Sequence, residues 1–288
     1  MINVNVYSLW RDSASHINRT LGQLEELNKL SLFNFRWFFY ENDSQDQTLD
    51  ILRNWQRGKE GSIFSEKLNS PRFGSVPNNV RTALLSYYRN KNKELGKGVG
   101  SNYSLVFDSD LIFNSNDFME LFGNLRLKED VVMVTSNCRQ NVPDFVFGTG
   151  DESYYDVYCL RDKWGNDAMY FADSPFYNQK DNEDFRSGMN VEVKSAFGGL
   201  ALIKSDVFDL VKWSADVHSE HVNFCYDVGQ YGKILAIPTS RPRTEIDLNS
   251  LNIENCKKIA ANEYSRYLEG NKLRQLSVLD SYRFSFDK

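Results

Sequence analysis

The chain has 288 residues, 41% of them hydrophobic and 25% charged, which is enough for one large or two small globular domains. Its net charge of −5 excludes the strongly basic surface that non-specific nucleic-acid binding requires. The longest apolar runs, such as 131–134 and 200–203, are far shorter than the ~18 residues of a membrane-spanning helix. We therefore expect no nucleic-acid partner and no membrane span.

The N-terminal residues show neither the basic nor the apolar segment of a secretory signal peptide, so we expect no leader or anchor. The cysteines Cys138, Cys159, Cys225 and Cys256 form no C-x-x-C pair, which argues against a zinc or redox motif. We expect reduced thiols and a cytoplasmic protein. Aromatic residues reach 14%. This richness fits a site that stacks rings and hydrogen-bonds hydroxyls, and equally fits a genome of biased base composition.

In the first 140 residues, apolar runs alternate with segments of helical periodicity. The predicted strands are 4–9, 34–40, 62–65, 103–107 and 130–136. The predicted helices are 13–30, 44–55, 77–95 and 116–125, the second with Ser44 or Asp46 as its N-cap. This alternation predicts an α/β fold whose mainly parallel sheet carries helices on both faces.

The regular pattern weakens at 137–194, which is rich in Asp, Asn, Tyr and Phe. We expect a long, irregular insertion, and long loops are often functional. The later predicted elements are a strand at 195–204, helices at 206–211 and 220–231, a strand at 233–238 and a helical tail at 254–280. We expect one domain at 1–240, with the segment 241–288 packed on it.

Polar clusters follow three of the predicted strands, at 8–12, 41–44 and 108–110. In open parallel sheets, ligands bind outside the carboxyl ends of the strands. We therefore expect these three clusters to converge on one edge of the sheet and to form a ligand site there.

The segment Asp108-Ser109-Asp110 is the most informative of the three, because its carboxylates lie between two apolar triplets, close to the core. Unpaired carboxylates are costly there. A hard cation such as Mg²⁺ or Mn²⁺ would neutralise them and could bridge the phosphates of a nucleotide. The alternative is a solvated turn in which Asp110 caps a helix.

Two further groups are candidates for a phosphate or nucleoside site. Glu41 and Asp43 would face a nucleoside, although a helix-capping turn explains them equally well. Arg81 and Arg89 lie eight residues apart on the helix before the D-x-D strand. A guanidinium there could reach a phosphate or a sugar hydroxyl, and the alternative is a solvated helix face.

Gly198 and Gly199 would allow the backbone to approach a ligand closely, unless they only form a bulge. Ser219-Glu220-His221 opens a predicted helix. Glu220 is a candidate base or acceptor-orienting group, and His221 could transfer a proton or be a third metal ligand. The alternative is an N-cap, Ser219, followed by a carboxylate that the helix dipole favours.

An ordered set of segments resembles the fungal capsule-associated α-1,3-mannosyltransferases and, more broadly, the GT-A glycosyltransferases. The resemblance covers roughly residues 1–240. The segments that carry it are Phe39-Tyr40-Glu41-Asn42-Asp43-Ser44, Arg89-Asn90, Asp108-Ser109-Asp110, residues 155–162 (YDVYCLRD), residues 195–199 (SAFGG) and Ser219-Glu220-His221.

The resemblance implies a GT-A fold, a nucleotide-diphospho-sugar donor and a Mn²⁺ or Mg²⁺ ion. It implies that Asp110 is the principal metal ligand, that Asp108 faces the metal, ribose or sugar, and that Arg89 touches the donor sugar or its phosphate. Glu220 would lie beside the reacting centre. The residues that would border the nucleoside are Ser8, Arg11, Glu41 and Asp43. Those that would line the sugar or acceptor side are Asp156, Arg161 and Asp162.

We therefore expect a metal-dependent hexosyltransferase that uses a GDP- or UDP-sugar. The aromatic insertion, with Trp164 among its rings, would bind the glycan acceptor. One alternative is a sugar nucleotidyltransferase, although residues 8–12 lack the glycine-rich phosphate loop expected of one. Another is a non-catalytic, glycan-binding relative.

Overall fold

The computed structural model describes residues 1–73, 78–216, 218–245 and 248–283, with the backbone alone at 250 and 273–283. The strands are β1 (Ile2–Trp10), β2 (Phe33–Asn42), β3 (Gly61–Glu66), β4 (Tyr103–Asp108), β5 (Val131–Ser136), β6 (Arg139–Gln140), β7 (Ser153–Tyr154), β8 (Arg161–Asp162), β9 (Val191–Ser195), β10 (Leu200–Lys204), β11 (Lys233–Ile237) and β12 (Arg243–Thr244). The helices are α1 (Ile17–Asn28), α2 (Thr48–Gln56), α3 (Asn79–Leu95), α4 (Ser115–Arg126), α5 (Gln179–Arg186), α6 (Ser205–Leu210), α7 (Glu220–Val228) and α8 (Ile253–Arg283), with a short 3₁₀ turn at Leu248–Ser250.

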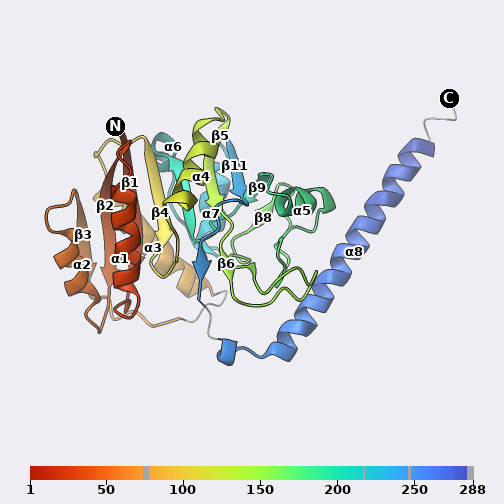
Figure 1. Ribbon diagram of the computed structural model, residues 1–288, viewed down its shortest axis with the longest axis horizontal. Coiled ribbons are helices and arrows are strands. Elements are labelled where there is room, and N and C mark those ends of the chain that lie inside the picture. Colours follow the sequence, from red (N-terminus) through yellow and green to blue (C-terminus); the bar gives the residue numbers. More distant parts are fainter. Residues whose placement is uncertain (74–77, 217, 246–247, 284–288) are drawn as a thin grey trace.

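The main sheet has the strand order β3-β2-β1-β4-β10-β5-β11-β9-β8 (Figure 1). Its parallel part comprises β3, β2, β1 and β4, together with the pair β5 and β11. Strand β10 runs antiparallel to both β4 and β5, and β9 runs antiparallel to β11 and β8. The predicted α/β sheet is therefore present, but it is mixed. A smaller sheet of order β12-β6-β7 lies beside it.

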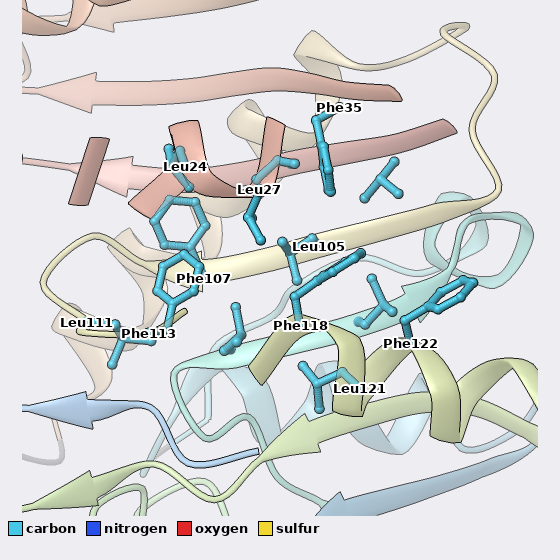
Figure 2. Close-up of a cluster of buried hydrophobic side chains, with 14 of the residues drawn as sticks. Leu24, Leu27, Phe35, Leu105, Phe107, Leu111, Phe113, Phe118, Leu121 and Phe122 are labelled. Atoms are coloured by element: carbon cyan, nitrogen blue, oxygen red, sulfur yellow. The ribbon is translucent and has the colours of Figure 1, made fainter. Parts of the chain in front are cut away.

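Two hydrophobic cores form because side chains alternate between the faces of each strand. On β4, Leu105 and Phe107 face one core and Val106 faces the other. Helices α1, α2 and α4 cover the first face, where Phe118 of α4 packs edge-on against Phe35 of β2 (Figure 2). Helices α6 and α7 contribute to the core on the second face. The predicted coverage of both faces is confirmed.

Helix starts follow local side-chain chemistry. Asn78 accepts hydrogen bonds from the backbone N–H groups of Val80 and Arg81, which starts α3. Residue 77, where this helix was predicted to begin, lies outside the described residues. The predicted start of α2 at residue 44 is wrong, because Ser44 accepts from the backbone of Asp12 and the helix begins only at Thr48.

The predicted single strand at 195–204 is also wrong. Gly198 and Gly199 both have positive φ angles and form a turn between β9 and β10. The segment 137–194 holds more regular structure than expected, including α5 and most of the smaller sheet.

Helix α8 packs on this insertion through ring contacts of Tyr264 and Tyr267 with Phe147, and its later turns extend away from the sheets (Figure 1). None of the described helices combines the length and apolarity needed to cross a membrane. All four cysteines are buried free thiols.

Candidate active site

Three strand ends bring the predicted polar clusters together. In the parallel register, Ser8 of β1 lies beside Phe39 of β2 and Phe107 of β4. Strands β1, β2 and β4 therefore end at one edge, directly before residues 11–12, 43–44 and 109–110. This convergence was predicted because the three clusters follow strands of an expected parallel sheet, and the structure confirms it.

Arg89 of α3 is the centre of the site. Its Nε donates to Glu220 Oε1 at 2.7 Å, and its Nη2 donates to Asp108 Oδ1 at 3.0 Å. The guanidinium also lies 5.1 Å from the centre of the Phe197 ring. The side chains of Arg89 and Glu220 are only 7% and 3% exposed. Burial lowers the pKa of Arg89, but the charges of Glu220 and Asp108 outweigh it and raise that pKa. Arg89 is therefore a fixed cation between two carboxylates.

Glu220 is positioned from two sides at the N-terminus of α7. Ser219 caps the helix through the backbone N–H of His221. The His221 ring stacks on Phe197 with centroids 3.7 Å apart, and its Nδ1 accepts from Trp213 Nε1. Burial, followed by the charge of Arg89, lowers the pKa of His221 well below its usual range. The neutral ring therefore carries its hydrogen on Nε2, which lies 3.4 Å from Glu220 Oε1 but makes no hydrogen bond to the described residues.

Asp108 and Asp110 lie where β4 ends. Burial is the main cause that raises the pKa of Asp108 to about 6, and the charges of Asp110 and Glu220 add to it against the opposing effect of Arg89. Asp110 is exposed, and its carbonyl accepts from Arg19 Nη2 at 3.1 Å. The pair therefore holds excess negative charge next to solvent.

These two carboxylates suit a divalent cation. Within the described residues, no group of three or more His, Cys, Asp or Glu side chains is placed to bind a metal. Mg²⁺ in nucleotide sites commonly takes one or two carboxylates and completes its shell with water and substrate phosphates. Asp108 and Asp110 provide that donor set, so the residues present fit the ion.

Asp156 links the insertion to the glycine turn. Its Oδ2 accepts from the backbone N–H groups of Phe197 and Gly198, at 3.1 and 2.7 Å. Burial raises its pKa to about 7, with Asp108 and Glu220 adding to the effect. A carboxyl group that titrates near neutrality among other carboxylates is typical of active sites.

The glycine turn has no room for a side chain. A Cβ at Gly198 would lie 2.0 Å from the Ser136 carbonyl oxygen, and one at Gly199 would lie 2.9 Å from Leu111. The Gly199 carbonyl accepts from the backbone N–H of Asp108 at 2.9 Å. The turn therefore joins β5 to the Asp108 loop, and its glycines are required for packing.

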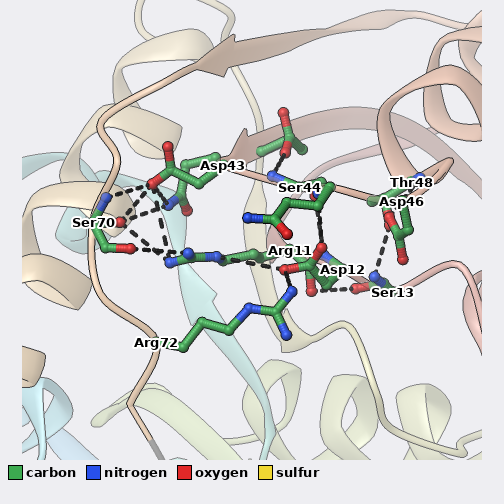
Figure 3. A network of polar contacts seen from close by, with 12 residues as sticks. Arg11, Asp12, Ser13, Asp43, Ser44, Asp46, Thr48, Ser70 and Arg72 are labelled. Atoms are coloured by element: carbon green, nitrogen blue, oxygen red, sulfur yellow. Dashed lines mark hydrogen bonds and ion pairs between the residues drawn. The ribbon is translucent and has the colours of Figure 1, made fainter.

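Arg11 and Asp43 belong to a polar network around Ser70 (Figure 3). Asp43 accepts from the backbone N–H groups of Leu68, Asn69 and Ser70. Burial raises the pKa of Asp43, but the hydrogen bonds from Ser70 and Asn42 outweigh it and lower that pKa. Arg11 donates to the Ser70 carbonyl at 2.9 Å. The network holds the segment after β3 against the ends of β1 and β2.

The remaining predicted nucleoside and phosphate residues lie near this edge. Ser8 is buried, and its hydroxyl makes no hydrogen bond to the described residues. Glu41 is also buried and accepts from Ser44 N and Ser65 Oγ. Arg81 is half-buried on α3, close enough for its charge to lower the pKa of His221.

The residues predicted for the acceptor side are less closely grouped. Arg161 is buried and pairs with Asp167 at 3.2 Å. Asp162 accepts from the backbone of Trp164 and Asn166, so it caps a turn. Trp164 is 51% exposed, with Lys163 over its ring. Their contact with an acceptor stays a prediction.

Sequence reasoning missed Ser70, Arg72 and Phe197. Ser70 and Arg72 follow β3, so the strand-end rule that found the other clusters would also have found them. Arg72 forms an ion pair with Asp12 (Figure 3). Phe197 packs against Arg89 and His221, a contact that no local pattern signals.

Comparison with solved structures shows the fold. The structure is similar to GalNAc-T7 with UDP, GalNAc and Mn²⁺, with a TM-score of 0.56, 14% identity and 93% of this chain covered. The chain spans 48% of the length of that protein. It is also similar to S. aureus TarS 1–349, with a TM-score of 0.50, 13% identity, and 93% and 72% of the two chains covered. Both are GT-A glycosyltransferases, so the predicted fold is confirmed.

No curated protein matches the chain in sequence. The family described as Cryptococcal mannosyltransferase 1 matches it over residues 9–237. This match includes every predicted site residue except Ser8, and it confirms the resemblance and the glycosyltransferase assignment predicted from the sequence. The chain therefore belongs to the Cryptococcal mannosyltransferase 1 family.

Proposed function

We propose that the chain is a metal-dependent hexosyltransferase that moves a hexose from a GDP- or UDP-sugar to a hydroxyl group of a glycan acceptor. The observation that carries this proposal is the ion-pair cluster of Arg89, Asp108 and Glu220 at the strand edge, in which Arg89 and Glu220 are buried. It puts a fixed cation beside Asp108, one of the two carboxylates proposed to hold the metal, and beside the carboxylate proposed to face the acceptor.

Asp108 and Asp110 would hold the Mn²⁺ or Mg²⁺ ion. When bound, the ion supplies positive charge opposite the diphosphate that leaves with the nucleoside. Arg89 keeps Asp108 in place through its 3.0 Å hydrogen bond. Because Arg89 is already paired with two carboxylates, we propose that it contributes to donor binding mainly by this positioning.

The nucleoside would lie against the ends of β1 and β2, bordered by Ser8, Arg11, Glu41 and Asp43. The buried, unpaired hydroxyl of Ser8 supports this placement. Asp43 would act mainly through the segment 68–70, because its oxygens are already occupied by that segment. Gly198 and Gly199 would let the backbone approach the donor beside the metal site.

Glu220 is the proposed catalytic group. In an inverting reaction it would take the proton of the acceptor hydroxyl, and in a retaining reaction it would orient that hydroxyl. His221 is neutral and lies beside Glu220. We therefore assign it a positioning role, in place of the proton-transfer or metal-ligand role that the sequence left open.

The insertion would bind the acceptor, with Asp156, Arg161, Asp162 and Trp164 on that side. Aromatic rings pack against the apolar faces of sugars, while carboxylates accept from sugar hydroxyls. We also propose that the protein works in a reducing compartment such as the cytoplasm, since all four cysteines are free thiols.

Donor turnover tests the proposal. The protein is incubated with a panel of GDP- and UDP-sugars and Mn²⁺, and released nucleoside diphosphate is measured. We expect Asp110→Ala and chelation of the metal each to reduce release at least ten-fold, with the exposed Asp227→Ala as a matched control that leaves it unchanged. Glu220→Gln should abolish transfer while the protein still binds nucleotide.

The alternatives give different results. A nucleotidyltransferase would release pyrophosphate during synthesis of a sugar nucleotide. A non-catalytic relative would show neither donor turnover nor metal-dependent nucleotide binding by calorimetry, and that result would refute the proposal. The anomer of the product distinguishes inversion from retention.

A further inference from the structure

A cavity of about 80 Å³ lies between the insertion and helix α8. The polar and aromatic side chains that line it include Tyr158, Arg161, Tyr170, Tyr177, Glu263 and Arg266. This space is enough for a few waters, since a cavity needs at least about 10–15 Å³ to hold one and a water takes about 30 Å³ in the liquid. The cavity can therefore take the edge of a sugar ring rather than the whole ring.

Glu263 gives the cavity its chemical character. The residue is 7% exposed, and its Oε2 is buried without a hydrogen-bond partner in the described chain. Its Oε1 accepts from Arg266 at 3.3 Å. Burial is the main cause that raises the pKa of Glu263. The charge of Arg266 and a hydrogen bond from the Tyr170 backbone stabilise this carboxylate in part, and further donors from a ligand in the cavity would reduce the remaining cost of its burial.

The other walls of the cavity favour a neutral sugar. Arg161 is paired with Asp167 at 3.2 Å, and Arg266 is paired with Glu263, so each arginine already has a carboxylate partner. Tyr158 and Tyr170 meet edge to face, with centroids 6.0 Å apart. Tyrosine rings offer apolar faces for the C–H groups of a pyranose and hydroxyls for its rim.

The cavity adjoins the candidate active site along two segments. It is lined by Val157, the neighbour of Asp156, and by His218, which directly precedes the Ser219 cap of Glu220. Arg161 of β8 also pairs with Ser195 of β9, just before the glycine turn. A sugar in the cavity would therefore lie next to the carboxylates of the proposed reaction.

We propose that this cavity is the acceptor subsite, that it binds the edge of one neutral pyranose unit, and that Glu263 of helix α8 accepts hydrogen bonds from the hydroxyls of that sugar. The assignment rests on the proposed function. It makes the C-terminal helix a part of acceptor recognition.

Saturation-transfer NMR on the full chain tests the subsite. The probes are the methyl pyranosides of mannose, glucose, galactose and N-acetylglucosamine, with methyl glucuronide as a charged comparison. We expect at least one neutral glycoside to bind in preference to the glucuronide. Glu263→Gln should weaken its binding at least ten-fold, and Glu254→Gln, at a 77% exposed side chain on the same helix, should not.

A second variant and a melting curve separate recognition from folding. Gln has the shape of Glu without the charge, so Glu263→Gln should melt no lower than the wild type while binding is lost. Tyr177→Ala, on another segment of the wall, should also weaken glycoside binding. Glycosides that bind both variants as well as the wild type, or that fail to bind the wild type, would overturn the subsite.

The two proposals fail separately. Metal-dependent release of nucleoside diphosphate without glycoside binding would support the proposed function and refute the subsite. Glycoside binding that needs Glu263, in a protein that neither binds nor turns over a nucleotide-sugar, would support the sugar-binding cavity and refute the proposed function.

Discussion

Replacing Arg89 with Met tests the most deeply buried charge cluster of the site. The substitution leaves Glu220, whose side chain is 3% exposed, and Asp108 without their common cation. Removing one partner of a buried ion pair typically costs about 3–5 kcal/mol, because the remaining charge stays buried without compensation. We expect Arg89→Met to lower the free energy of unfolding by about that amount.

The assay is urea denaturation of the metal-free protein. Arg53→Met, at an exposed position of α2, is the matched control and should change stability by less than about 0.5 kcal/mol. The double variant Arg89→Met with Glu220→Gln should recover part of the loss, because it removes the buried charge that the single variant leaves.

Two results would refute this reasoning. One is a loss below about 1 kcal/mol in Arg89→Met, which would place the pair in the range of an exposed salt bridge. The other is a double variant that is no more stable than the single one. Either would mean that water or a rearranged side chain satisfies Glu220 without Arg89.

Two further predictions concern the glycine turn and pH. Gly198→Ala should lower the free energy of unfolding by on the order of 2–6 kcal/mol, because the residue has a positive φ and its new Cβ would lie 2.0 Å from the Ser136 carbonyl oxygen. The control Gly58→Ala has a positive φ but no atom within 4 Å of its Cβ, so it should cost about 1–2 kcal/mol. Equal losses in chemical denaturation would contradict the packing argument. Since burial raises the pKa of Asp156 to about 7 from an ordinary value near 3.9, the folded state binds the proton more tightly, and the stability gained below pH 4 is lost as pH rises through 7. Each pKa unit corresponds to about 1.4 kcal/mol of stability. We therefore expect the difference between the unfolding free energies at pH 5 and at pH 8 to be smaller in Asp156→Asn than in the wild type, with both proteins measured in chelator. An unchanged difference would show that Asp156 is not its cause.

The sequence predicted the elements of the first half of the chain because each of them has a strong local pattern. Ile17, Leu21, Leu24 and Leu27 are all buried, as their helical spacing indicated. Strand direction is different, because nothing within 200–204 shows that this strand lies between β4 and β5 and opposes both. The mixed sheet therefore could not be predicted from periodicity.

The same limit applies to the site. Asp108 and Asp110 could be found because they follow an apolar strand, a feature that is local in sequence. The contact of Arg89 with Glu220 joins residues 131 positions apart, and only the tertiary fold brings them together. The start of α2 was misplaced because Ser44 serves the β1–α1 loop, which is itself a tertiary contact.

The position of β10 has a consequence for folding. The strand enters the sheet between β4 and β5, although it follows β5 by more than 60 residues in the chain. Until it is added, Asp108 lacks the backbone acceptor at Gly199, and β4 and β5 each present an open edge that can pair with another chain. A nascent chain that ends before residue 200 therefore contains Asp108 and Asp110 without the strand that pairs with β4. The addition of β10 covers one edge of β4 and one edge of β5 in a late, long-range step, and helix α7 with Glu220 follows it in the chain.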